Sequence, residues 1–190
     1  MALVMATAPA VEPVSLAEAK AHLRIDHDVE DALITSLIIT SRLHIEAALG
    51  LALITQDWML RLDRWPEDDA VLLPIRPVQS VEAVRIADAG GDFDDVTAES
   101  YSVDGLSNPP RLVPTGVWSK PGVTVQGIEI AFTAGYGDEP GDVPQPIRQA
   151  LLMLIAHWYE HREPMAIGTP AARIPDTISA LLAPYRTVRL

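Results

Sequence analysis

The sequence predicts an α+β fold, a helical bundle with an inserted small antiparallel β region. Apolar residues recur with a helical period near both ends of the chain and with a two-residue period in the middle. Glycine and proline stand where these periods change. Helices are predicted near residues 16–24, 28–49, 147–161 and 176–183, and the β insert spans residues 53–133.

The first two helices carry clear end signals. Ser15 and Glu18 fit a capping box, in which each side chain accepts from the other residue's free backbone N–H. Asp28 is expected to cap the second helix, and Gly50 stands just past its end. Ile39 and Leu43 form a second apolar stripe, opposite the broad face built from Leu33, Ile34, Leu37, Ile38, Ile45 and Leu49. This second stripe packs either on the β region or on a neighbouring copy.

The β region begins where apolar and polar residues start to alternate, from Leu53 to Asp63. Further strands are predicted at 71–73, 81–86, 101–103 and 123–133, with a turn at Gly90-Gly91. The apolar phase of the last strand changes at Gly127, which predicts a β-bulge there.

The C-terminal part contains a strongly apolar helix and a short one. Pro146 suits the first turn of the helix to residue 161, and Pro184 is expected to end the last helix. The predicted organisation is a disordered arm at 1–14, a main domain at 15–161, and a linker, short helix and terminal arm at 162–190.

Composition limits the possible functions. The chain has 190 residues, of which 48% are hydrophobic, enough for a folded core. Its formal charge of −12 argues against a protein that grips nucleic-acid phosphates. The absence of cysteine excludes disulfides and thiolate metal sites. The longest stretches without Asp, Glu, Lys or Arg have 11 residues, so no membrane span is expected.

One short motif suggests catalysis. His157, Glu160 and His161 match H-x-x-E-H, the inverted zinc-protease motif, on a predicted helix. Such a site needs a third protein ligand, and no second ligand helix is recognisable. The other interpretation is a helix end with capping histidines. No persuasive active site is found, and no metal or cofactor is expected.

A set of segments in a characteristic order carries a resemblance to a known family. The chain resembles the head–tail connector, or adaptor, family of tailed bacteriophages, which has relatives in prophages and gene transfer agents. The segments are SLAEAKAHLRID (15–26), the following DALI, ITQ-x-W (54–58), FTAGYGD (132–138), VPQPIRQALL (143–152), HWYEHRE (157–163) and LLAPYR (181–186).

The resemblance implies a structural, non-enzymatic protein. About twelve copies would form a ring beneath the capsid portal, extend the DNA channel and provide the platform for the tail. The implied partners are the portal protein, neighbouring copies and a downstream neck or stopper protein, while DNA passes without sequence-specific binding. The implied location is the neck of a virion or phage-like particle assembled in the bacterial cytoplasm.

The same resemblance implies which residues meet the partners. By this resemblance, portal docking falls on the C-terminal segment. The second apolar stripe of the 28–49 helix, independently of the resemblance, makes Ile39 and Leu43 candidates for subunit packing. The docking candidates are Leu181, Leu182, Pro184, Tyr185, Arg186, Arg189 and Leu190. The alternatives are a zinc-dependent hydrolase using the H-x-x-E-H helix, or another structural protein of neck or tail completion.

Overall fold

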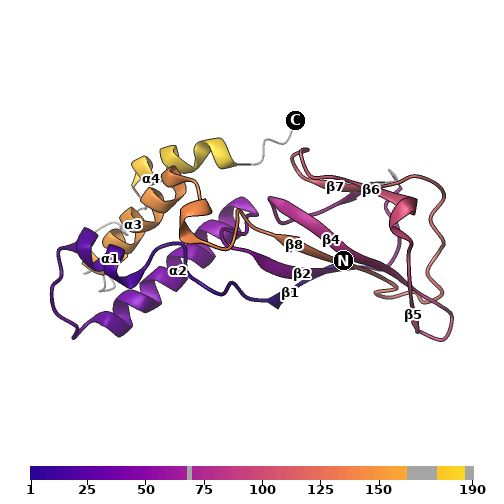
Figure 1. The fold of residues 1–190 in the computed structure, drawn as a ribbon, viewed down its shortest axis with the longest axis horizontal. Helices are drawn as coiled ribbons and strands as arrows, with labels where there is room; N and C mark the ends of the chain where they lie inside the picture. Colours follow the sequence, from indigo (N-terminus) through magenta and orange to yellow (C-terminus); the bar gives the residue numbers. More distant parts are fainter. Residues whose placement is uncertain (68–69, 162–174, 187–190) are drawn as a thin grey trace, which may run out of the picture. The chain divides into compact units, whose positions relative to one another are not determined.

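The computed structural model describes residues 1–67, 70–161 and 175–186, which divide into two compact units (Figure 1). The helical unit comprises Val11–Leu49 and Gly137–Arg186, and the β unit comprises Met1–Ala10 and Gly50–Tyr136. The chain therefore enters the β unit, leaves it for the first two helices, returns to it, and ends in helices. The predicted α+β fold is confirmed.

The described residues of the helical unit form four α-helices. They are α1 (Leu16–Leu23), α2 (Asp31–Leu49), α3 (Gln145–Glu160) and α4 (Asp176–Leu182), with 3-10 turns η2 (Pro140–Asp142) and η3 (Ala183–Tyr185). Helix α3 contacts each of the other three helices. Its inward side chains Ile147, Leu151 and Leu154 are fully buried, because apolar residues on one face of this helix coincide with the face that meets α2.

The start of α1 agrees with its predicted signal, whereas the start of α2 does not. The Ser15 hydroxyl accepts from the Glu18 N–H at 3.2 Å, and the Ser15 N–H donates to Glu18 at 2.9 Å. These backbone and side-chain bonds from Ser15, helped by Arg148, lower the pKa of Glu18 despite partial desolvation. Helix α2 begins at Asp31 rather than Asp28, because residues 28–30 form a turn beneath the Lys20 ammonium, which lies 2.6 Å from Asp28 and 2.7 Å from Asp31.

The β unit contains two antiparallel sheets. The larger has the strand order β1-β2-β8-β4-β5 and the smaller β3-β7-β6. The strands are β1 (Ala2–Thr7), β2 (Gln56–Leu62), β3 (Val71–Leu72), β4 (Val78–Ala87), β5 (Phe93–Asp95), β6 (Tyr101–Asp104), β7 (Arg111–Pro114) and β8 (Ile128–Ala134). The centre of the β unit's core is formed by alternate residues of β2 and β8, including Leu60, Ile130 and Phe132.

The N-terminal segment corrects the prediction of a disordered arm over residues 1–14. Residues 2–7 form β1, which pairs antiparallel with β2 so that Leu3 lies opposite Leu60 and Met5 opposite Trp58. Leu3 thereby packs against the core of the β unit. No local sequence pattern predicts the pairing of a strand with a segment more than fifty residues away.

The predicted strand over residues 123–133 is too long. Strand β8 begins at Ile128, and Gln126 has a left-handed backbone with φ 53°. A Cβ on Gly127 would lie 2.6 Å from the Pro121 side chain, so this glycine permits a tight turn rather than the predicted bulge. The bulges occur instead where β1 meets β2 and where β4 meets β8. The short strands β5 and β7 were not predicted.

The turn after β8 gives a direct test of this fold. Gly135 has φ +145°, and an added Cβ would lie 2.7 Å from the backbone of Thr55. We expect Gly135→Ala to destabilise the chain by about 1–3 kcal/mol through strain at a backbone angle that side chains avoid, with the clash adding to it. Denaturant unfolding measures the loss. Gly116→Ala, at a glycine with open space around it, is the control and should change stability by less than about 1 kcal/mol.

Candidate interaction surfaces

Helix α2 directs its charged residues inward. Arg42 and Glu46 are only 6% and 7% exposed. The Arg42 guanidinium donates to Glu46 at 2.8 Å and to both carboxylate oxygens of Glu12 at 2.8 and 3.2 Å. Desolvation acts to lower the pKa of Arg42, but the hydrogen bonds and charges of the two glutamates outweigh it and raise that pKa. Arg42 therefore stays charged inside the helical unit, and it can be buried because both glutamates compensate its charge.

The outward face of α2 is correspondingly free of charge. Ile39 and Leu43 are 38% and 48% exposed, while Ile34, Ile38, Ile45 and Leu49 are buried. The exposed positions of the helix carry no Asp, Glu, Lys or Arg; they are Ala32, Thr35, Ser36, Ile39, Thr40, Leu43, His44, Ala47 and Ala48. By length and composition alone α2 would be long and apolar enough to cross a membrane, a test that core helices also pass. On a chain of charge −12, this uncharged face is suited to contact another protein.

The C-terminal segment is only partly available at the surface. Leu182 is buried and Leu181 and Tyr185 are half-buried, whereas Pro184 and Arg186 are exposed. Helix α4 ends at Leu182 and is followed by the 3-10 turn η3, so Pro184 lies just past the end of the α-helix, as predicted. Beside it lies a cavity of about 250 Å³, lined by Leu182 and Arg186 together with His44, Ala48 and Ile178. The docking candidates Arg189 and Leu190 lie outside the described residues.

The H-x-x-E-H segment forms the end of α3. The His161 backbone N–H donates to the His157 carbonyl at 3.1 Å, and His161 Nδ1 lies 2.8 Å from the same oxygen. The two imidazole rings are 4.6 Å apart. Among residues 1–67, 70–161 and 175–186, no three His, Asp or Glu side chains are grouped as a metal site. The geometry is that of histidines at a helix C-terminus, where the His161 ring lies against a carbonyl of the last turn.

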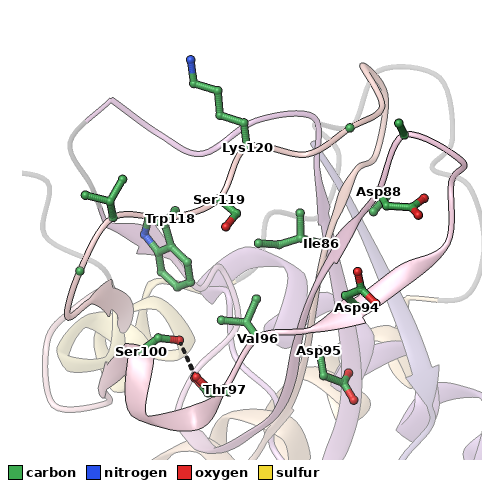
Figure 2. Close-up of a pocket in the computed structure, with 15 residues that line it drawn as sticks. Ile86, Asp88, Asp94, Asp95, Val96, Thr97, Ser100, Trp118, Ser119 and Lys120 are labelled. Atoms are coloured by element: carbon green, nitrogen blue, oxygen red, sulfur yellow. Dashed lines mark hydrogen bonds between the residues drawn. The ribbon is translucent and has the colours of Figure 1, made fainter.

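The β unit contains a pocket of about 500 Å³ beside β4 and β5 (Figure 2). Ile86, Val96 and Trp118 turn toward one another across it, whereas Lys120 points away. Three aspartates lie around its rim, but two of them have local tasks. Asp88 accepts from the backbone N–H groups of Gly90 and Asp92 in the turn, and Asp95 pairs with Arg85 at 2.8 Å. Asp88 and Asp95 therefore stabilise the local structure. The pocket does not present a converging set of catalytic groups.

Trp118, which lines this pocket, belongs to an aromatic pair. Trp65 and Trp118 are stacked with ring centroids 4.1 Å apart, and the Trp65 indole N–H donates to the Ser119 carbonyl at 2.8 Å. This contact holds two loops together, and the sequence analysis missed it. No periodic pattern links residues so far apart in loops.

The GYGD segment is a strand-to-helix turn. The Asp142 carboxylate accepts from the Glu139 N–H at 3.0 Å, and a Cβ on Gly137 would lie 2.2 Å from Asp142. The Asp142 carboxylate therefore fills the space beside Gly137, and its negative charge disfavours an anion in this turn.

The chain belongs to the head completion protein family, whose model matches residues 13–188. No protein among curated sequences matches it. The resemblance to head–tail connectors with gene transfer agent relatives is thereby confirmed.

Several solved structures contain similar chains. One from "Virion of native gene transfer agent (GTA) particle" is 32% identical, covers 100% of this chain and 97% of its own, and has a TM-score of 0.83. A chain from "Neck of empty GTA particle computed with C6 symmetry" is 33% identical with the same coverage and a TM-score of 0.83. A third, from "Neck of native GTA particle computed with C12 symmetry", is 32% identical with the same coverage and a TM-score of 0.81.

The histidines at the end of α3 can be tested directly. We expect His157→Asn with His161→Asn to leave particle assembly and bound zinc unchanged, because asparagine keeps a polar group at the helix end. The measurements are particle yield and metal content of the purified chain, with His22→Asn and His27→Asn, two exposed histidines, as the matched control. Loss of assembly together with loss of zinc would support the hydrolase alternative.

Proposed function

We propose that this chain is a structural connector that forms a ring in the neck of a tailed-phage-like particle, beneath the capsid portal. The observation that carries the proposal is its similarity, along its whole length, to chains from gene transfer agent necks. One of those necks was computed with C12 symmetry, which supports a ring of about twelve copies. In this role the chain extends the DNA channel, supports the tail through a downstream neck protein, and catalyses no reaction.

The charge distribution suits a ring around DNA. The chain carries 26 acidic and 14 basic residues, so a ring accumulates negative charge. A channel lined by negative charge repels DNA phosphates and lets the genome pass without being held. The same repulsion opposes association between copies, so contacts between copies need surfaces without charge. The exposed face of α2 provides one, and we assign Ile39 and Leu43 to packing against a neighbouring copy.

The α2 face makes a clear prediction. Ile39→Glu with Leu43→Glu should leave the subunit folded, since both side chains are exposed, but should prevent ring formation by placing charge in an apolar contact. Light scattering at two ionic strengths and ring occupancy in particles measure this. The control is Leu106→Glu with Val117→Glu, which adds equal charge at fully exposed loop positions. Wild-type occupancy of the α2 variant would remove Ile39 and Leu43 from the interface.

The C-terminal segment is proposed to dock onto the portal. Its members Pro184 and Arg186 are exposed, and Arg186 lines the cavity next to Leu182, so an apolar ring and a cation are available to a partner. Leu181, Tyr185, Arg189 and Leu190 complete the proposed docking segment, and Leu182 supports it from the core of the helical unit.

Removing the last five residues, which include Arg186, Arg189 and Leu190 of the docking segment, separates folding from docking. Deleting residues 186–190 should leave the helix content and melting temperature nearly unchanged but abolish binding to the portal protein. Arg186→Ala with Arg189→Ala should weaken binding and flatten its salt dependence, because two charge contacts are lost. Arg64→Ala with Lys120→Ala, two exposed cations of the β unit, is the charge-matched control. If the truncated chain binds the portal at wild-type affinity, the docking site lies elsewhere.

A further inference from the structure

The β unit has four strand edges that differ in how well they are protected. The larger sheet ends at β1 and β5, and the smaller at β3 and β6. An edge strand presents unpaired backbone N–H and C=O groups and can pair with another chain, so proteins shorten such edges or place charge on them. Among the described residues, none of these four strands has a second partner strand.

Two of the edges are protected in this way. Strand β5 has three residues, among them Asp94, and β3 has only two residues. Acidic side chains on an edge repel an approaching acidic chain, and two residues are too few for a stable pairing.

The other two edges, β1 and β6, lack this protection. Strand β1 has six residues, ALVMAT, without a charge or a proline. Strand β6 has one charged residue, Asp104, which accepts from the Ser107 N–H at 3.1 Å and from Arg111 at 3.0 Å. Hydrogen bonds from Ser107 and then from Arg111 lower the pKa of Asp104, so its charge is already compensated within the loop.

Each unprotected strand also exposes a valine. Val4 of β1 is 53% exposed and Val103 of β6 is 41% exposed. On the opposite face of β1, Leu3 packs against the core of the sheet, so the strand is fixed in position with its outer edge free. A fixed strand loses little conformational entropy on pairing, and β-branched side chains pack well across strands.

We infer that neighbouring copies join strand to strand, with the outer edge of β1 in one copy pairing with the outer edge of β6 in the next. This inference rests on the proposed ring. A cyclic ring needs two different, complementary surfaces on every copy, and β1 and β6 provide one of each. Pairing of β1 with β1 would instead close a two-fold dimer. The occupant of the β1 edge is therefore a second copy of this chain.

The absence of cysteine makes cross-linking a clean test. A variant with both Val4→Cys and Val103→Cys is assembled into particles and oxidised mildly. Directly opposed residues of paired antiparallel strands lie about 4.5–5.5 Å apart at Cα, within the reach of a disulfide. The expected result is a ladder of covalent oligomers. Ala2→Cys with Val103→Cys tests the register two residues away, and a ladder from either pair supports the inference.

The controls distinguish specific pairing from chance collision. Leu3→Cys with Val103→Cys places one thiol on the face toward the core, and Val4→Cys with Leu106→Cys places one on a fully exposed loop residue. Neither should give a ladder. A dimer from Val4→Cys alone would overturn the inference in favour of β1–β1 pairing. Particles that contain the ring but yield no ladder from either β1–β6 pair would overturn it while leaving the proposed function intact, whereas absence of any ring would overturn the proposed function itself.

Discussion

The orientation of α2 depends on the buried contact between Arg42 and its two carboxylates. This helix has two apolar stripes, and only one of them can enter the core of its own unit. Removing one partner of a buried ion pair costs about 3–5 kcal/mol, and each fully buried aliphatic side chain contributes about 1.5–3 kcal/mol. One face of α2 therefore points into the helical unit, because it carries Arg42, Glu46 and the buried stripe that includes Ile34 and Ile45. Ile39 and Leu43 remain outside as a consequence.

This arrangement links folding to assembly. A chain of charge −12 repels its own copies, so association is favoured only where surfaces lack charge. The structure has such surfaces in both units: the outer face of α2 in the helical unit, and the edges of β1 and β6 in the β unit. Some acidic side chains lie instead in the turn after β4, where Asp88 caps backbone N–H groups, and at the β5 edge, where Asp94 opposes pairing.

The helices were predictable because their signals are local. The Ser15 capping box and the 3.6-residue periods of α2 and α3 are each contained within a few turns of chain. The period of α2 also indicated a second apolar stripe at Ile39 and Leu43, without deciding what it packs against. Strand β1 was missed because its partner β2 is distant in the sequence. The alternation of Val123 and Val125 imitated a strand, but the left-handed backbone at Gln126 ends such a pattern. The Trp65–Trp118 stack had no sequence signal, since loop geometry alone brings those rings together.

Electron microscopy of the intact particle neck tests the central claim most directly. The account predicts that this chain is found as a closed ring adjoining the portal, with the outer face of α2 covered by the next copy and the C-terminal segment in contact with the portal. A reconstruction that places the chain outside the neck, or that shows isolated copies with the α2 face open to solvent, would contradict it.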